Sequence, residues 1–315
     1  MNPLFNNEKH YLTLNNYLKN RYQKKVYKIS LNGNFSCPNR DGKISTKGCL
    51  FCSAMGSGDF AGNANDSIDI QFKKIKENYL TKWPEGYYIA YFQANTNTYG
   101  SVEELKKRYD QIIHDDFLLD NKIVALSIAT RPDCLDDDII DYLNQLSKKI
   151  ELWIELGFQT ANETTASLMN RGYNNDVLIN AIKKLKTIDA KIIVHIINGL
   201  PNDTKEDMIN TVKFLNNLQI DGIKIHMLHV IKDSLLGQIY QKEPFPILTL
   251  NEYVDIVTTQ LRYLNENIII HRLTGDAVKE NLIAPLWTLK KFVVLNEIDK
   301  KMRKDNIYQG DLCIQ

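Results

Sequence analysis

The chain has 315 residues, of which 43% are hydrophobic and five are cysteine, and its formal net charge is +1. That length and apolar content allow one large core, and the sparse, odd set of cysteines excludes a small disulfide-stapled secreted module. The first residues lack the apolar run of a signal peptide, and no later stretch is long enough to cross a bilayer. We therefore expect a cytoplasmic protein with reduced thiols and no membrane partner.

Short β-branched and aromatic runs alternate along the chain with longer stretches of helical period. The predicted strands are 26–31, 87–93, 123–129, 150–157, 191–197, 222–230 and 267–273. The predicted helices are 67–80, 102–115, 136–148, 174–188, 204–218 and 250–264. Such alternation is typical of parallel strands with helices packed outside them, and six units before residue 235 are fewer than the eight of a closed barrel. The pattern predicts an α/β fold, an open, partial (β/α)6 TIM-type barrel.

The division of the chain follows from the first strand and from two prolines. Residues 1–25 are expected to form a helical lead-in, and residues 26–240 the partial barrel. Pro244 and Pro246 interrupt helical continuation just after the sixth unit. We expect residues 241–315 to form a C-terminal α/β extension packed on the barrel.

Polar residues follow the predicted strands where those strands end. A cysteine-containing loop follows the first strand, residues 93–98 follow the second, and residues 130–134 follow the third. The fourth strand supplies Glu155 and Gln159, and the fifth ends in residues 198–201. Because the carboxyl ends of parallel strands meet at one edge of a sheet, five consecutive strands deliver polar groups to one mouth.

The most informative residues are three cysteines, Cys37, Cys49 and Cys52, in the loop after the first strand. Iron–sulfur clusters are usually held by four cysteines and structural zinc sites by four ligands. A compact trio therefore leaves one metal position open for a substrate or a cofactor. The alternative is a structural zinc site completed by a histidine, although no fourth ligand lies at the usual spacing. Cys134 and Cys313 are expected to be a packed thiol and a tail residue.

These cysteines and six further motifs resemble the radical S-adenosylmethionine (SAM) superfamily, and within it the YhcC/YtqA-like branch related to the radical domain of the elongator catalytic subunit. The usual signature is C-x3-C-x2-C with an aromatic residue before the last cysteine. Phe51 and the pair Cys49 and Cys52 keep half of it, but eleven residues separate Cys37 from Cys49. This wider spacing matches the branch. The other motifs are residues 35–42, 91–99, 129–133, 155–160, 198–201 and 271–276.

The resemblance implies a 4Fe-4S cluster on Cys37, Cys49 and Cys52, with the amino and carboxylate groups of SAM on its fourth iron. Electron transfer from a reductant such as flavodoxin or ferredoxin then cleaves SAM, and the resulting 5′-deoxyadenosyl radical abstracts a hydrogen from an unreactive carbon. A barrel suits this chemistry, because so reactive a radical must be held dry and close to one C–H bond. The resemblance assigns no residue to direct action on the substrate.

The same resemblance assigns contacts with SAM. Gln93, Ala94 and Asn95 occupy the place of a glycine-rich motif that receives the methionine amino group, and Arg171 matches an arginine suited to the methionine carboxylate. The remaining assignments are Gln159 to the ribose or methionyl part, Glu155 to the ribose hydroxyls or to orienting Arg131, Gly199 to close approach of the adenine, and Met227 to the adenine face.

Four histidines fall on predicted strands, where a hydrogen-bonded core residue is the ordinary interpretation. They are His195, His226, His229 and His271. His226 and His229 are three positions apart and are expected to face opposite sides of a strand. Arg272 and Asp276 either reach the site from the C-terminal extension or pair with each other.

The resemblance also indicates a substrate. Elongator-like relatives act at C5 of the wobble uridine of tRNA, and this branch is similar to enzymes that convert 5-carboxymethylaminomethyl-uridine to 5-aminomethyl-uridine. Basic residues at both ends of the chain agree with an RNA partner, although charge alone favours two solvated helix faces. These residues are Lys19, Arg21, Lys24, Lys25 and Lys28, and Lys290, Lys291, Lys300, Lys301, Arg303 and Lys304. The alternatives are a radical enzyme acting on a small metabolite or peptide and a non-catalytic zinc-binding adaptor.

Overall fold

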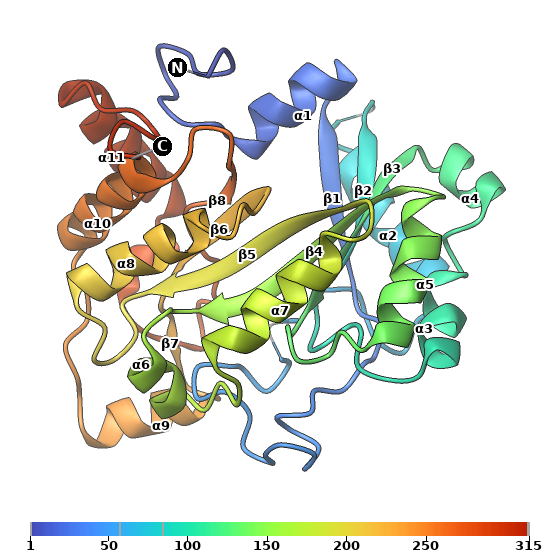
Figure 1. Cartoon of the computed structure of the whole chain (residues 1–315), viewed down its shortest axis with the longest axis horizontal. Helices are drawn as coiled ribbons and strands as arrows, with labels where there is room; N and C mark the ends of the chain where they lie inside the picture. Colours follow the sequence, from blue (N-terminus) through green and yellow to red (C-terminus); the bar gives the residue numbers. More distant parts are fainter. Residues whose placement is uncertain (1, 57, 84, 314–315) are drawn as a thin grey trace.

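The fold is built on one parallel sheet that curls into a half-barrel, with helices on its outer face (Figure 1). The computed structural model describes residues 2–56, 58–83 and 85–313. Seven strands lie in the order β1-β2-β3-β4-β5-β6-β8, and the prediction of an open, partial α/β barrel is confirmed. The strands are β1 (Val26–Leu31), β2 (Tyr87–Phe92), β3 (Ile123–Thr130), β4 (Glu151–Gln159), β5 (Ala190–Asn198), β6 (Gly222–Met227) and β8 (Ile269–Arg272).

The helices that cover the sheet begin at polar caps and bury their apolar faces. Ser101, Thr204 and Thr249 each form a capping box at the start of a helix. The helices are α1 (Leu14–Tyr22), α2 (Ile68–Leu80), α3 (Val102–Tyr109), α4 (Asp115–Asp120), α5 (Asp137–Ser147), α6 (Glu163–Leu168), α7 (Asn175–Leu185), α8 (Lys205–Asn216), α9 (Leu235–Lys242), α10 (Leu250–Tyr263) and α11 (Lys291–Lys304), with a 3-10 turn η1 (Leu286–Leu289). In the described part of the chain, none of these helices has the length and apolar content that a membrane span requires.

Two predicted elements are divided in the structure. The helix expected at 102–115 ends at Tyr109, and a second helix starts after His114, whose ring nitrogen accepts from the backbone N–H of Phe117. The strand expected at 222–230 ends at Met227. The residues beyond it form β7 (Val230–Ile231), which pairs antiparallel with β9 (Leu282–Ala284) outside the main sheet.

The interior of the half-barrel is layered. At the amino ends of the strands, the side chains of Ile89, Ala125, Trp153 and Ile193 pack against Leu18 of α1. In Figure 1, α1 accordingly lies at the upper end of the strands, and the loop after β1 lies at the lower end. Side chains alternate along a strand, so the residues two positions further on also face inward. This second layer contains Tyr91, Ser127, Glu155 and His195, and it is polar.

The seventh strand comes from the segment predicted as a C-terminal extension. β8 pairs with β6 in parallel, and Thr13 adds a single bridge to Ile270 at the outer edge of β8. Residues from both ends of the chain therefore complete one side of the barrel. The boundaries at residues 25 and 240 stay a prediction, since the main sheet continues across the second of them.

Candidate functional site

A cavity of about 570 Å³ lies inside the half-barrel, at the carboxyl ends of the strands. Its lining reaches from the loop after β1 down to the polar second layer of the barrel. Most of the predicted site residues contribute to this lining: Cys37, Cys49, Cys52, Gln93, Asn95, Arg131, Glu155, Gln159 and Met227. Ala94, Gly199 and Arg171 are not among the described residues that line it.

The cysteine loop brings its three thiols to this cavity, and none of them forms a disulfide. The Sγ of Cys49 accepts a hydrogen bond from Asn39 Nδ2 at 3.4 Å. A hydrogen bond from Cys52 outweighs burial and, with the charge of Arg131, lowers the pKa of Cys49 to about 7. The same contact and burial raise the pKa of Cys52. A thiolate held among donors and positive charges is the chemistry that an iron–sulfur cluster requires of its ligands.

The structure also shows whether possible metal ligands lie close enough together to hold a single metal ion. In the described residues, no three Cys, His, Asp or Glu side chains are grouped closely enough to hold one metal ion. A single zinc ion draws its thiolates to about 2.3 Å from one centre. A cluster that binds each cysteine through a different iron needs a wider spacing than that.

The cysteine loop is hydrogen-bonded to the loop between α6 and α7, the α6–α7 loop. Asn39 Nδ2 donates to the carbonyl of Asn170 at 2.6 Å, and Asn170 Nδ2 donates to the carbonyl of Gly48 at 2.7 Å. The backbone N–H of Leu50 donates to the carbonyl of Met169 at 3.0 Å. Asn170 takes a left-handed conformation, with φ of 55°, to make this turn. The position of the three cysteines therefore depends on residues more than 100 positions later in the chain.

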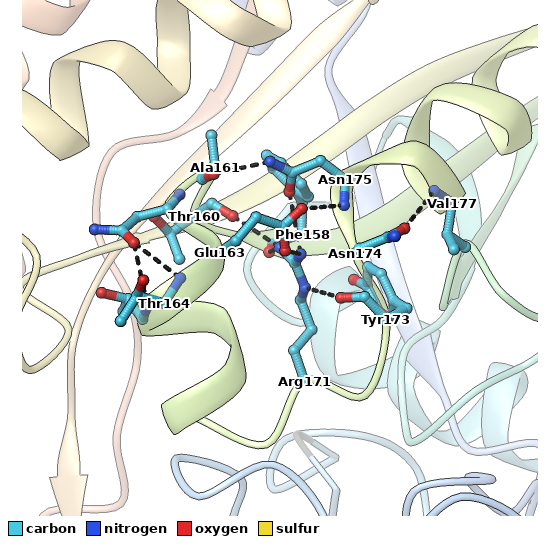
Figure 2. Close-up of polar contacts among 12 residues, drawn as sticks. Phe158, Thr160, Ala161, Glu163, Thr164, Arg171, Tyr173, Asn174, Asn175 and Val177 are labelled. Atoms are coloured by element: carbon cyan, nitrogen blue, oxygen red, sulfur yellow. Dashed lines mark hydrogen bonds and ion pairs between the residues drawn. The ribbon is translucent and has the colours of Figure 1, made fainter.

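Arg171, in the α6–α7 loop, donates all its N–H groups in hydrogen bonds within the protein (Figure 2). Its guanidinium donates to the carbonyls of Phe158, Thr160 and Tyr173 at 2.8 to 3.1 Å. Its other donors reach Glu163 at 3.2 Å and Asn175 at 3.1 Å. The five N–H groups of an arginine are thereby satisfied, and the side chain is 1% exposed. The predicted contact with the SAM carboxylate is not supported by this geometry, in which Arg171 holds the end of β4 against the α6–α7 loop.

Arg131, by contrast, lines the cavity. It makes a two-point contact with Asp133, with Nε at 2.8 Å and Nη2 at 2.7 Å from the two carboxylate oxygens. Its guanidinium lies over the ring of Tyr173, 5.0 Å from the ring centre. The Nη1 group has no hydrogen bond to any described residue and is free to bind a ligand. Arg131 is paired with Asp133 rather than oriented by Glu155, which corrects one of the two roles expected for Glu155.

Two predicted SAM contacts have strained backbone conformations at strand ends. Asn95, just after β2, has φ of 56°, and Gln159, the last residue of β4, has φ of 70°. Left-handed backbone is unfavourable for residues other than glycine and is concentrated at functional sites. The side chain of Asn95 is held by the carbonyl of Phe35 at 3.1 Å. Ala94, between Gln93 and Asn95, is buried away from the cavity.

Gly199 and Met227 lie where β5 and β6 end. Gly199 has φ of 87°, and a small pocket beside it is lined by Leu228 and Leu248. Met227 lines both this pocket and the main cavity. The predicted adenine contacts of these two residues stay predictions, and only Met227 faces the space in which the cysteines lie.

Glu155 occupies the centre of the polar second layer. Its Oε1 accepts from Ser127 Oγ at 2.6 Å and from Lys28, and its Oε2 pairs with His195 Nε2 at 2.7 Å and with Lys224. Burial opposes ionisation of this carboxyl, but the charges of Lys224 and Lys28 hold its pKa well below the usual range. Because four donors already surround Glu155, this geometry does not support its predicted contact with ribose hydroxyls.

Lys28 and Lys224 were not predicted as site residues. Lys28 was grouped with the basic residues expected on a solvated face or in contact with RNA, but it lines the cavity and pairs with Glu155. The signal was present in the sequence, because each lysine sits in the middle of an apolar strand at a position that alternation directs inward.

The four predicted core histidines and the pair Arg272 and Asp276 all line the cavity. His226 and His229 were expected on opposite sides of a strand, which is wrong because β6 ends at Met227 and the chain turns. Arg272 and Asp276 pair at 3.0 Å within the lining, so both roles considered for them apply. In the described residues, His229 Nε2 and His271 Nδ1 have no hydrogen-bond partner.

Much of the basic sequence at the two ends is neutralised by ion pairs. Near the first strand, Arg21 pairs with Glu151 and Lys24 with Glu85. In α11, Lys301 pairs with Asp305 at 3.1 Å. These contacts agree with the solvated-face interpretation for that part of the charge.

Comparison with known proteins agrees with this architecture. A model of the radical SAM superfamily matches residues 41–215, and a radical SAM C-terminal domain matches residues 220–304. The uncharacterized protein YtqA of Bacillus subtilis is 44% identical over 98% of this chain and 94% of its own length. Protein YhcC of Escherichia coli K12 is 31% identical over 92% of this chain and 91% of its own length.

Two more distant similarities concern proteins with longer chains. A tRNA-2-methylthio-N(6)-dimethylallyladenosine synthase of Fusobacterium nucleatum is 21% identical over 59% of this chain and 42% of its own length. The structure of Elp3 from the archaeon Methanocaldococcus infernus has a TM-score of 0.66 and 17% identity, and the match covers 90% of this chain and 64% of that one. The last similarity shows a shared fold. On the family model and the identity to YtqA and YhcC, this chain belongs to the radical SAM superfamily.

Proposed function

We propose that this protein modifies tRNA by reductive cleavage of SAM, at the C5 side chain of wobble uridine, in a conversion of the 5-carboxymethylaminomethyl to the 5-aminomethyl type. The observation that carries the proposal is that three cysteines of one loop line the same cavity as polar groups from the ends of β2, β3 and β4. Membership of the radical SAM superfamily implies the SAM-dependent class of reaction. The tRNA substrate is the further step.

The residues of the cavity fit the two cofactors. Cys37, Cys49 and Cys52 would hold a 4Fe-4S cluster, because the loop presents three thiols beside donors and positive charge. With SAM and one electron from a donor such as flavodoxin or ferredoxin, the cluster supplies a 5′-deoxyadenosyl radical. Polar groups of Gln159 and Arg131 would orient SAM beside the cysteine loop.

Two similarities support tRNA as the substrate. The Fusobacterium nucleatum relative is named for a tRNA product, and the fold is shared with Elp3. An open half-barrel also suits a large substrate, since a nucleotide base must leave its stack to reach a buried reactive group. Because much of the charge at the two ends is ion-paired, we assign phosphate contact to Arg40, which lines the cavity from the cysteine loop.

The test is anaerobic reconstitution with iron and sulfide, followed by reduction in the presence of SAM and bulk tRNA. Mass analysis then measures 5′-deoxyadenosine and the nucleosides of the digested tRNA, with Cys49→Ala as the control without a cluster. We expect 5′-deoxyadenosine and a mass change of one C5-substituted uridine, both absent from the control. Formation of 5′-deoxyadenosine with no nucleoside change would exclude tRNA and favour a small metabolite or peptide. A protein that assembles no cluster would contradict the proposal as a whole.

A further inference from the structure

The polar second layer of the barrel lies far below the cysteine loop. Glu155 precedes Gln159 by four residues on β4, which corresponds to roughly 13 Å along an extended strand. Lys28, Lys224 and Glu155 all line the lower part of the cavity. A ligand group that reaches them is therefore distinct from the amino and carboxylate groups of SAM, which belong beside the cysteines at the other end.

This layer carries more positive than negative charge. Two ammonium groups, those of Lys28 and Lys224, share the single carboxylate of Glu155. Burial lowers the pKa of His195 to about 4 and holds the pKa of His226 and His271 well below the usual range, so these rings add no charge near neutral pH. The Lys224 side chain is 9% exposed, and burial lowers its pKa to about 7 in spite of Glu155.

Nearby groups do not correct the imbalance. Arg272 also lines the cavity and adds a further positive charge. Its carboxylate partner, Asp276, is shared with Lys291 at 2.9 Å. In the described residues, Lys28 and Lys224 have no carboxylate partner other than Glu155.

Both lysines have unused donors. An ammonium group has three N–H bonds. Lys28 contacts Glu155 and Ser127, and Lys224 contacts Glu155 and the hydroxyl of Tyr91 at 3.3 Å. One N–H of each lysine has no hydrogen-bond acceptor among the described residues, and each ammonium group lies 4.4 Å from the centre of the Tyr91 ring. A buried surplus cation is costly, and an anion that accepts from both donors would remove that cost.

We propose that Lys28 and Lys224 form an anion subsite that binds a carboxylate group of the substrate, and that Glu155 is the positioning residue that holds the two ammonium groups in place. When both lysines are protonated, the Lys28, Glu155 and Lys224 triad has a surplus of one positive charge, which one carboxylate group would neutralise. The identification of that carboxylate with a 5-carboxymethylaminomethyl group rests on the proposed function, but the subsite itself does not.

The experiment compares two small probes that differ in charge. Binding of N-acetylglycine and of its neutral amide, N-acetylglycinamide, is measured by calorimetry on the reconstituted protein with SAM bound. We expect the wild-type protein to bind the acid about tenfold or more tightly than the amide, as charge-assisted hydrogen bonds provide. Equal binding of the two probes, or tighter binding of inorganic phosphate than of the acid, would overturn the subsite without any variant.

Variants then locate the effect. Lys224→Met and Lys28→Met should each remove the preference for the acid over the amide. Lys74→Met is the matched control, since Lys74 is an exposed lysine paired with Asp66 at 2.9 Å on α2. Folding of each variant is checked by thermal melting. A preference that survives in both folded cavity variants would refute the assignment to these two lysines.

A parallel assay separates this inference from the proposed function. The same proteins are given tRNA that carries 5-carboxymethylaminomethyl-uridine, and product and KM are measured. Preference for the acid with no tRNA product would leave the subsite standing and reject the proposed substrate. Conversion of the tRNA without any preference for the acid would support the proposed substrate and reject the subsite.

Discussion

Two arginines close to the cysteine loop, Arg131 and Arg171, have opposite surroundings. Arg171 is enclosed by five acceptors and does not reach the cavity, whereas Arg131 lines the cavity and keeps one end of its guanidinium unbound. The ring of Tyr173 lies between them, 4.7 Å from Arg171 and 5.0 Å from Arg131. A motif that contains an arginine therefore shows that the residue belongs near the site. Only the count of its satisfied donors shows whether it faces a ligand or holds the framework.

The largest effect is expected for a ligand-facing residue of the cysteine loop. Cys49→Ala should abolish the brown colour and the visible absorbance of the reconstituted protein, because a cluster held by three thiolates loses one of them. The fold should persist, as measured by circular dichroism. Cys134→Ala is the control, since Cys134 is a buried thiol that does not line the cavity. A cluster retained by the Cys49 variant would end the ligand assignment.

The framework arginine should affect stability first. Arg171→Ala removes a buried side chain with five hydrogen bonds and leaves the carbonyls of Thr160 and Tyr173 without this donor, so we expect a loss of about 3–5 kcal/mol in the free energy of unfolding. Arg171→Lys should recover little of it, because an ammonium group has three donors. Chemical denaturation measures both. Unchanged stability with weakened SAM binding would instead support the predicted contact of Arg171 with the SAM carboxylate.

The cavity arginine should show the opposite division. Arg131→Met is expected to weaken SAM binding by about tenfold, the scale of one lost charge-assisted hydrogen bond to a carboxylate. Its effect on unfolding should be smaller than that of Arg171→Ala, because Arg131 makes two hydrogen bonds, both to Asp133, whereas Arg171 makes five. Equilibrium binding of SAM to the reconstituted protein measures this. If the two variants lose stability equally, the contrast between the arginines fails.

The smallest effect is expected for Asp203, a carboxylate in the loop between β5 and α8. Burial raises the pKa of Asp203 to about 6, and neither of its carboxylate oxygens has a hydrogen-bond partner in the described residues. A raised carboxyl pKa means that ionisation costs stability, so wild-type stability falls as pH rises from about 4 through 6. Asp203→Asn should therefore gain about 1 kcal/mol over wild type at pH 8, allowing for partial exposure, and less at pH 5. Melting curves at both pH values measure this gain in stability. An equal gain at pH 5 and pH 8 would contradict the assignment of the effect to ionisation of Asp203.

Most of the fold could be predicted because periodicity is a local property. Each predicted main-sheet strand lies within a few residues of the observed one, and the cysteine loop was located from spacing alone. The division of helix 102–115 depended on capping by His114, which periodicity does not report. The surface position expected for Lys28 was wrong for a related reason, since its partner Glu155 lies on β4. The orientation of Arg171 depended on acceptors from the end of β4 and from α7, which a short motif does not contain.

The chain ends also matter to the order in which this molecule folds. Lys9 and Tyr11 contact Asp299, and the backbone N–H of Leu12 donates to Gln309 at 2.9 Å. These contacts join residues nearly 300 positions apart and flank α1, which closes the floor of the barrel. During synthesis, the first-made segment must wait for residues 299–309 before it can settle. The barrel floor is therefore completed only after residues 299–309 have been synthesised.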